Sequence, residues 1–305
     1  MHWLKQGLIF VPDGSANWAK DSALTPTPIL LNEDTIRVYA GFRDERGVSR
    51  IGYVDLDSRN PANIKYVSKE PVLDIGQPGT FDDNGVILGD VIWQGSELWM
   101  YYVGFQLVEK VKFLAFTGLA ISKDGGYSFN RYSNVPVLDR TDAELYINAV
   151  HSVIVEDGVF KAWIGGGSGW EWIDGAPFPK YNIRYVESVD GINFKKYSIL
   201  CIDCKGDEYR IGRPRVIKDG QVYKMFYTKG TRRRDYLPGY AESKDGITWE
   251  RLDDKLGIGL SESGWDSLHL SYPSIISVNE STYMFYNGNN MGKTGFGYAV
   301  LDKGS

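Results

Sequence analysis

Three carboxylates, Asp21, Asp83 and Glu208, each come shortly before one of the apolar runs that recur along this sequence. Paired carboxyl groups can cleave a glycosidic bond, because one protonates the leaving oxygen and the other acts as base or nucleophile. If the fold joins the starts of these runs, the three side chains could meet across one site. We expect Asp83 or Glu208, together with Asp21, to carry proton transfer. The alternative for an aspartate in such a position is that it caps a turn.

Five basic residues lie near the same points of the chain: Arg43, Arg210, Arg213, Arg215 and Lys229. Arg213 and Arg215 flank a proline, and residues two apart on a strand point to the same side. Such basic groups can bind a carboxylate or a phosphate, and a guanidinium does so through forked hydrogen bonds. The alternative is that they pair with carboxylates in a structural network. We predict a site that attracts anions, with an acidic sugar, a sugar phosphate or phosphate itself as its substrate.

Six further residues in these segments are candidates for substrate binding: Asp44, Asp82, Asp90, His151, Trp170 and His269. We expect the two histidines to hydrogen-bond to a substrate rather than to catalyse. Trp170 follows a glycine-rich stretch, 165–169, which lacks the Gly-Lys-Ser/Thr ending of a nucleotide-binding loop. Its indole could stack on a sugar ring, or it could pack as an ordinary aromatic residue of the fold.

Short strands must position these residues. Aromatic residues make up 14% of the chain, and alternating apolar runs are separated by glycine and Asp-Gly turns. One such pattern recurs at 28–41, 91–104, 152–165, 216–229 and 275–288. The alternation indicates β-strands, and the period of roughly 60 residues indicates five repeated units.

A second hairpin signal follows in the middle three units. It reads Ser-x-Asp-Gly at 122–125, 188–191 and 243–246, with an aromatic residue shortly after it. Asp-Gly favours the tight turns that match the twist of antiparallel strands, and the Ser and Asp side chains can bond turn amides. Each unit is therefore predicted to be a four-stranded antiparallel sheet, like the blade of a β-propeller.

The last unit stops after its third strand, 296–300, whereas the N-terminal run 3–10 resembles the fourth strands of other units. We therefore predict that 3–10 pairs near 296–301, which closes the ring and covers two strand edges. The predicted fold is all-β: one domain over 1–305, a five-bladed β-propeller of four-stranded antiparallel blades, with its ring closed by the N-terminal strand. The starts of the first strands then converge at a central funnel, where the candidate residues would lie.

Two stretches carry a resemblance to a known group of enzymes. They are Tyr272-Pro273-Ser274-Ile275-Ile276 with Tyr283-Met284-Phe285-Tyr286, and Phe81-Asp82-Asp83 with Met100-Tyr101-Tyr102-Val103-Gly104. They resemble the inner-blade motifs of five-bladed glycoside hydrolases, a group that includes families 32, 43 and 68 and the mannoside phosphorylases of family 130. The resemblance implies the propeller fold and a carbohydrate-active enzyme.

The three acids that family 43 enzymes carry are absent from the matching positions, which hold Thr25, Ala149 and Gly212. An ordinary family 43 activity is therefore not expected. We expect a glycoside hydrolase-like enzyme that acts on an anionic or phosphate-bearing sugar. Two alternatives stay open: a phosphorylase or glycosyl transferase of the same fold, and a glycan-binding propeller without catalysis.

Composition excludes several other classes. The net charge of −5 gives no basic field for nucleic acid, and no apolar run reaches the ~18 residues of a membrane helix. Cys201 and Cys204 have the spacing of half a zinc site but no second pair, so no metal or other cofactor is expected. The start of the chain shows no export signal, and we expect a cytoplasmic protein whose partner is a carbohydrate or sugar phosphate. The sequence makes no prediction of oligomeric state.

Overall fold

The computed structural model describes residues 1–233 and 235–302, and their regular structure is almost entirely β-strand. The strands form five antiparallel units of four. Unit one contains β2 (Asp21–Asn32), β3 (Thr35–Arg43), β4 (Ser49–Asp57) and β5 (Ile64–Val67). Unit two contains β6 (Val86–Gln94), β7 (Glu97–Gln106), β8 (Leu114–Ser122) and β9 (Asn130–Arg131). Unit three contains β10 (Ile147–Glu156), β11 (Val159–Ile173), β12 (Ala176–Ser188) and β13 (Ile199–Ile202).

Unit four contains β14 (Glu208–Asp219), β15 (Val222–Thr231), β16 (Tyr236–Ser243) and β17 (Glu250–Arg251). Unit five contains β18 (Ser271–Val278), β19 (Ser281–Asn287), β20 (Phe296–Leu301) and β1 (Trp3–Phe10). Two single turns, η1 (Asp253–Lys255) and α1 (Asn289–Gly292), complete the regular structure of the described residues. The predicted all-β class with antiparallel sheets is confirmed.

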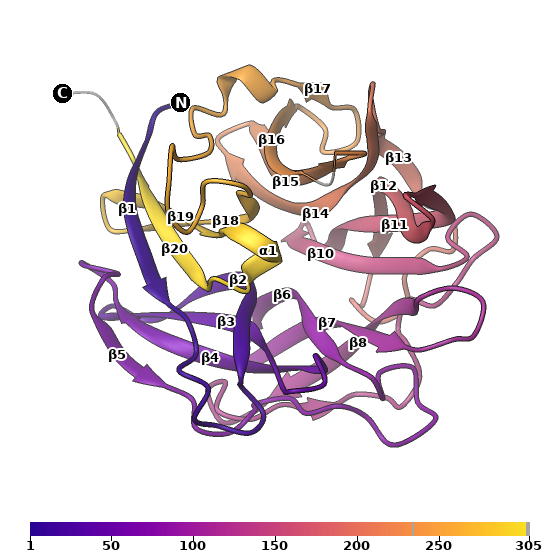
Figure 1. Ribbon diagram of the computed structural model, residues 1–305, viewed down its shortest axis with the longest axis horizontal. Coiled ribbons are helices and arrows are strands. Elements are labelled where there is room, and N and C mark those ends of the chain that lie inside the picture. Colours follow the sequence, from indigo (N-terminus) through magenta and orange to yellow (C-terminus); the bar gives the residue numbers. More distant parts are fainter. Residues whose placement is uncertain (234, 303–305) are drawn as a thin grey trace.

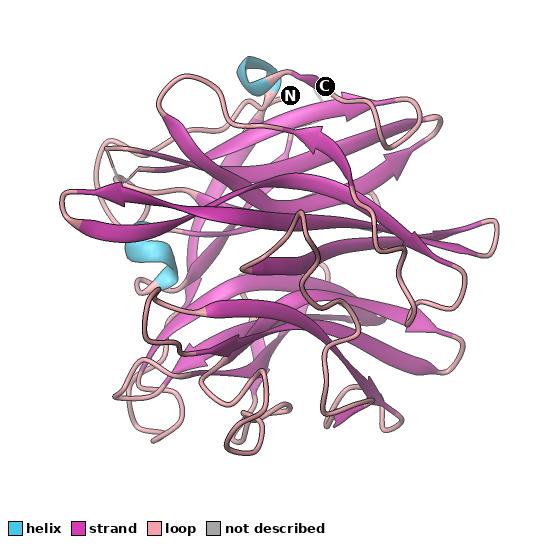
Figure 2. Cartoon of the chain, turned by 90° about the vertical axis from the view of Figure 1, so that its right-hand side faces the viewer, coloured by secondary structure: helices cyan, strands magenta, loops and turns pink. Residues whose placement is uncertain are grey.

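The first strand of each unit, β2, β6, β10, β14 or β18, lies near the centre of the molecule, with the later strands farther out (Figure 1). Short parallel pairs join neighbouring units, as between Ile147 and Ala115 and between Tyr181 and Arg210. Seen from the side, loops emerge at both ends of the strands (Figure 2). Because the strands are antiparallel, the starts of the first strands and the ends of the second strands share one end of the molecule.

The N-terminal strand completes the fifth unit. β1 pairs antiparallel with β20, from Trp3 opposite Leu301 to Phe10 opposite Phe296, so the predicted pairing is confirmed. Trp3 is buried and meets the ring of Phe226 edge-on, with centroids 6.2 Å apart. This strand covers an edge of β20 that would otherwise expose unpaired backbone groups.

The Ser-x-Asp-Gly turns join neighbouring units. In each turn the serine hydroxyl donates to the aspartate, as from Ser188 to Asp190 at 2.8 Å. The glycine carbonyl then accepts a hydrogen bond from an aromatic residue of the preceding unit, as Gly191 does from Tyr101 and Gly246 from Trp163, both at 2.8 Å. The repeated turn therefore connects each middle unit to the one before it. Over 1–233 and 235–302, no helix is long and apolar enough to cross a membrane.

Candidate functional site

A bulge near the start of every first strand shapes the centre of the molecule. The strand register shifts around Thr25 and Pro26, Gly89, His151, Arg213 and Pro214, and Tyr272 and Pro273. Thr25, Arg213 and Tyr272 have φ of 52°, 54° and 57°, a strained conformation for residues other than glycine. Bulges redirect side chains, and the equivalent positions in all five units place these bulges around one axis.

Arg213 and His151 occupy the middle of this axis. The Arg213 guanidinium donates to the carbonyl oxygens of Leu88 and Gly89, the latter at 2.8 Å, and to the Thr27 hydroxyl at 2.9 Å. It also lies 3.0 Å from Nδ1 of His151. Burial lowers the pKa of Arg213 to about 10, and burial together with the Arg213 charge holds the pKa of His151 well below its usual value. Arg213 thus ties units one, two and three together.

Arg210, at the start of β14, is buried, and none of the described carboxylates pairs with it. Its guanidinium carbon lies 4.3 Å from the ring centre of Tyr236 and 4.8 Å from that of Tyr209. No carboxylate of the described residues forms an ion pair with it, and its buried Nε has no acceptor. Burying a charge without a partner is costly, so an anionic ligand would stabilise this position.

Arg43, at the end of β3, is the second guanidinium of this kind. It is partly buried, and its Nε also has no acceptor within the described part of the chain. Tyr272 lies close enough to sense both arginines: burial and then Tyr181 raise the pKa of its phenol to about 12, and the charges of Arg210 and Arg43 oppose that rise. We refer to Arg43, Arg210, Tyr181, Tyr236 and Tyr272 as the arginine–tyrosine cluster.

Asp21 lies on β2, opposite Arg43 of this cluster. It is the register partner of Arg43, and residues directly opposite each other on antiparallel strands project to the same side. The Ser22 hydroxyl donates to its carboxylate at 2.6 Å. Within the described ranges, no lysine or arginine forms an ion pair with Asp21. Among residues 1–233 and 235–302, Asp21 therefore has no cationic partner, and Arg43 opposite it has no anionic one.

The other two predicted proton-transfer residues have partners. Both oxygens of Glu208 accept hydrogen bonds from Arg251, at 2.8 and 3.0 Å. Asp83 accepts from the amide of Gly79 at 2.8 Å and so caps a turn. The structure does not bring either carboxylate into contact with Asp21.

Several predicted binding residues also lie in hydrogen-bonded networks. Asp82 accepts from Tyr102 and Arg131. Arg215 donates to Asp90 at 2.6 Å, and the second oxygen of Asp90 accepts from the amide of Val153 at 2.8 Å.

Asp44 and Lys229 are engaged in the same way. Asp44 accepts from the amides of Arg46 and Val48 and pairs with Arg50. Lys229 donates to Asp253 at 2.8 Å. The sequence left a structural network open as the alternative to ligand binding. Such a network accounts for the contacts of Asp44, Asp82, Asp90, Arg215 and Lys229.

Aromatic residues extend the cluster. Trp170 meets Phe113 and Tyr146 edge-on, with ring centroids 5.4 and 6.3 Å apart, and its buried indole nitrogen has no acceptor among the described residues. His269 accepts from the amide of Asn290 at 3.0 Å and lies 6.1 Å from the Tyr236 ring. These rings offer the faces that sugar rings stack on.

Sequence reasoning missed the tyrosines of the cluster, because it selected funnel residues by charge. One signal was present: Tyr272 opens the Tyr-Pro motif, and its φ is positive. Gly212 is a second signal, since a Cβ there would lie 2.7 Å from the Tyr181 ring. Among residues 1–233 and 235–302, no group of three or more histidine, cysteine or acidic residues could hold a metal ion.

Comparison with known proteins finds similarity to protein sequences and, separately, to solved structures. No protein-family model matches the chain. The chain is 35% identical over 305 residues to the uncharacterized protein Rv1502 of Mycobacterium tuberculosis (strain ATCC 25618 / H37Rv), covering 99% of this chain and 100% of that protein.

The solved structures show the fold. One, a BT0996 RGII complex, has a TM-score of 0.73 at 19% identity, covering 99% of this chain and 92% of that one. A thermostable family-43 glycoside hydrolase has a TM-score of 0.67 at 15% identity, covering 94% and 90%. A structure from the family 130 of mannoside phosphorylases, described as containing glycoside hydrolases that target β-1,2 mannosidic linkages in Candida mannan, has a TM-score of 0.69 at 14% identity, covering 99% and 94%. The predicted resemblance to five-bladed glycoside hydrolases is confirmed at the level of fold.

Proposed function

This chain belongs to the family of the mycobacterial protein Rv1502, and from that premise we propose that it is a carbohydrate-active enzyme built as a five-bladed propeller. Its centre binds the negative group of an anionic sugar or of phosphate. The observation that carries this proposal is the pair of guanidiniums, Arg43 and Arg210, that have no carboxylate partner in the described part of the chain. An oxyanion with two or more acceptor oxygens matches their forked donors.

Phosphorolysis fits this arrangement better than hydrolysis. Hydrolysis by paired carboxylates needs a second free carboxylate to activate water, whereas Glu208 and Asp83 are already hydrogen-bonded to Arg251 and to a turn amide. In phosphorolysis, phosphate itself is the nucleophile, and one carboxylic acid is sufficient. We assign that acid to Asp21.

In the proposed reaction, Asp21 gives its proton to the glycosidic oxygen while an oxygen of phosphate attacks the anomeric carbon. The bond between the anomeric carbon and the glycosidic oxygen breaks, and the products are a sugar 1-phosphate and a free alcohol. Arg43 and Arg210 hold the phosphate in position, and their charges stabilise its negative charge in the transition state. Trp170 and the cluster tyrosines provide the aromatic surface for the sugar.

The test is phosphate-dependent turnover. Purified protein is incubated with a panel of oligosaccharides, with and without inorganic phosphate, and ³¹P NMR detects sugar phosphate. Product only with phosphate supports phosphorolysis, whereas free sugar formed equally without phosphate supports hydrolysis. Anion binding without any turnover supports the glycan-binding alternative, which the residues Thr25, Ala149 and Gly212 at the family acid positions favour. Absence of anion binding overturns the proposal.

A further inference from the structure

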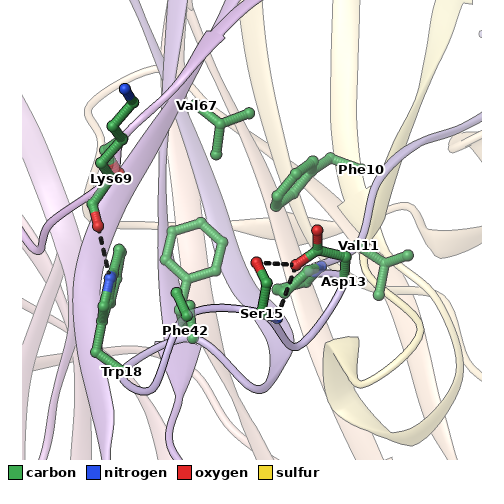
Figure 3. Close-up of a pocket in the computed structure, with 12 residues that line it drawn as sticks. Phe10, Val11, Asp13, Ser15, Trp18, Phe42, Val67 and Lys69 are labelled. Atoms are coloured by element: carbon green, nitrogen blue, oxygen red, sulfur yellow. Dashed lines mark hydrogen bonds between the residues drawn. The ribbon is translucent and has the colours of Figure 1, made fainter.

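A pocket lies apart from the arginine–tyrosine cluster and shares no lining residue with it. Its volume is about 440 Å³, and it lies at the seam where β1 of unit five meets unit one (Figure 3). The walls come from Phe10 at the end of β1, the segment 11–19, Phe42 on β3, and Val67 to Lys69 at the end of β5 and just after it. The volume is within the range of small-molecule sites.

Three aromatic rings belong to the apolar wall, and of these Phe10 and Trp18 are partly exposed whereas Phe42 is only 1% exposed. Phe42 meets Phe10 and Trp18 edge-on, with ring centroids 5.9 and 5.3 Å apart. The indole nitrogen of Trp18 donates to the carbonyl oxygen of Lys69 at 2.9 Å, which fixes the orientation of that ring. In Figure 3 these rings and Val67 surround the opening, so a bound molecule would meet aromatic faces and edges on more than one side.

One carboxylate stands at the rim of this pocket. Asp13 accepts both the amide and the hydroxyl hydrogen of Ser15 on one oxygen, at 2.8 and 2.6 Å, and these bonds lower its pKa. Asp13 is therefore ionised at neutral pH. Its second oxygen accepts no hydrogen bond from the described residues and points toward Phe10, whereas the Lys69 side chain extends away from it (Figure 3). The pocket thus combines an aromatic wall with a carboxylate that forms no ion pair within the part of the chain that the structure describes.

We propose that this pocket binds a small organic cation with an apolar ring, its ammonium group beside Asp13 and its ring against Trp18 and Phe10, the two partly exposed rings. Aromatic rings attract cations through their negative faces, and a nearby carboxylate adds to that attraction. A sugar fits less well, because a polyhydroxylated ring needs several polar partners and this wall is mainly apolar. The ligand would bridge β1 and unit one and so stabilise ring closure.

Two probes of the same shape and opposite charge test the proposal: phenethylammonium and 3-phenylpropionate. Isothermal titration calorimetry measures their affinities, and the Trp18 indole NMR signal reports the location. Asp13→Asn removes the charge but keeps the acceptor for Ser15. The matched control is Asp57→Asn, since Asp57 also accepts two turn amides, those of Arg59 and Asn60, but lies outside the pocket.

We expect phenethylammonium to bind the wild type and Asp57→Asn equally, and Asp13→Asn about tenfold more weakly. We expect 3-phenylpropionate to bind the wild type at least about tenfold more weakly than phenethylammonium. Val67→Phe should fill the pocket and abolish binding without changing the circular dichroism spectrum. No saturable binding, equal affinity for the two probes, or unchanged affinity in Asp13→Asn would each overturn the proposal. Because no funnel residue takes part, these outcomes are independent of phosphorolysis.

Discussion

Glu208 and Arg251 form a two-pronged ion pair that joins the first and last strands of unit four. Its N–O distances are 2.8 and 3.0 Å, and each side chain is only 9% exposed. Arg251 also donates to Asp253 at 2.7 Å, so the guanidinium is shared between two carboxylates. A carboxylate held in this way has its lone pairs occupied, which suits a structural role better than proton donation.

Glu208→Gln is therefore expected to destabilise the protein by about 1.5–3 kcal/mol, because it removes the charge-assisted hydrogen bonds to Arg251, while Asp253 still pairs with that guanidinium. Chemical denaturation measures this change in the free energy of unfolding. Glu250→Gln is the control, since Glu250 is the exposed neighbour of Arg251 on β17. Unchanged stability together with lost turnover would instead return Glu208 to the set of catalytic acids.

Because β1 closes the ring, substitutions at neighbouring residues of this strand should differ sharply in their effect on the free energy of unfolding. Trp3 is 5% exposed, whereas Leu4 is 44% exposed. Trp3→Ala should cost about 3–5 kcal/mol through the cavity that it leaves, and Leu4→Ala less than about 0.5 kcal/mol. Deleting residues 1–11 should remove most of the stability, as measured by thermal melting. A truncated protein with an unchanged Tm would contradict the closure argument.

The fold could be predicted because its determinants are local and repeated. The Asp-Gly turns and alternating aromatics mark each unit, and the missing last strand indicates the pairing of Trp3 with Leu301. The bulges at His151 and Arg213 could not be predicted in the same way. They depend on how five strands pack around one axis: Pro214 follows Arg213, but no proline or glycine marks the bulge at His151 in the sequence.

The candidate site could be predicted only in part. The position of Arg210 and Arg43 at the converging ends follows from the repeat. The repeat does not show which charged side chains are neutralised, because their partners come from fourth strands that are distant in the sequence. Arg251 lies 43 residues from Glu208, and Arg131 lies 49 residues from Asp82. Only the assembled units show that Arg43 and Arg210 have no such partner among the residues that the structure describes.

Asp21 is the proposed proton donor, so Asp21→Asn should lower turnover by about 100-fold or more. The amide keeps the shape and can still accept the Ser22 hydroxyl hydrogen, so folding should be little affected. Initial rates in saturating phosphate measure the effect. The control is Asp34→Asn, at an exposed turn between β2 and β3. Full activity in Asp21→Asn would remove the assignment.

His151 predicts a pH dependence of stability. Its folded pKa lies well below the usual value of 6.5, so below pH 6.5 the unfolded chain binds a proton that the folded protein does not. The contribution of His151 to the free energy of unfolding is complete above pH 6.5. It is lost as the pH falls below that value, by up to about 1.4 kcal/mol per pH unit. Urea denaturation at about pH 7.5, 6.5 and 5.5 should show a shallower decline for His151→Asn. Parallel declines in the two proteins would show that His151 titrates normally.

Arg210 should carry function at the expense of stability. Because its buried guanidinium has no counter-ion among the described residues, Arg210→Met is expected to leave the unfolding free energy in anion-free buffer within about 1 kcal/mol of the wild type, or to raise it. Phosphate should raise the Tm of the wild type but not that of Arg210→Met. The control is Arg37→Met, since Arg37 is also buried but pairs with Asp55 at 2.7 and 2.8 Å. That variant should lose about 3–5 kcal/mol and keep its response to phosphate. If Arg210→Met were destabilised as strongly as Arg37→Met, the guanidinium would be structural, and the anion site would have to be sought elsewhere.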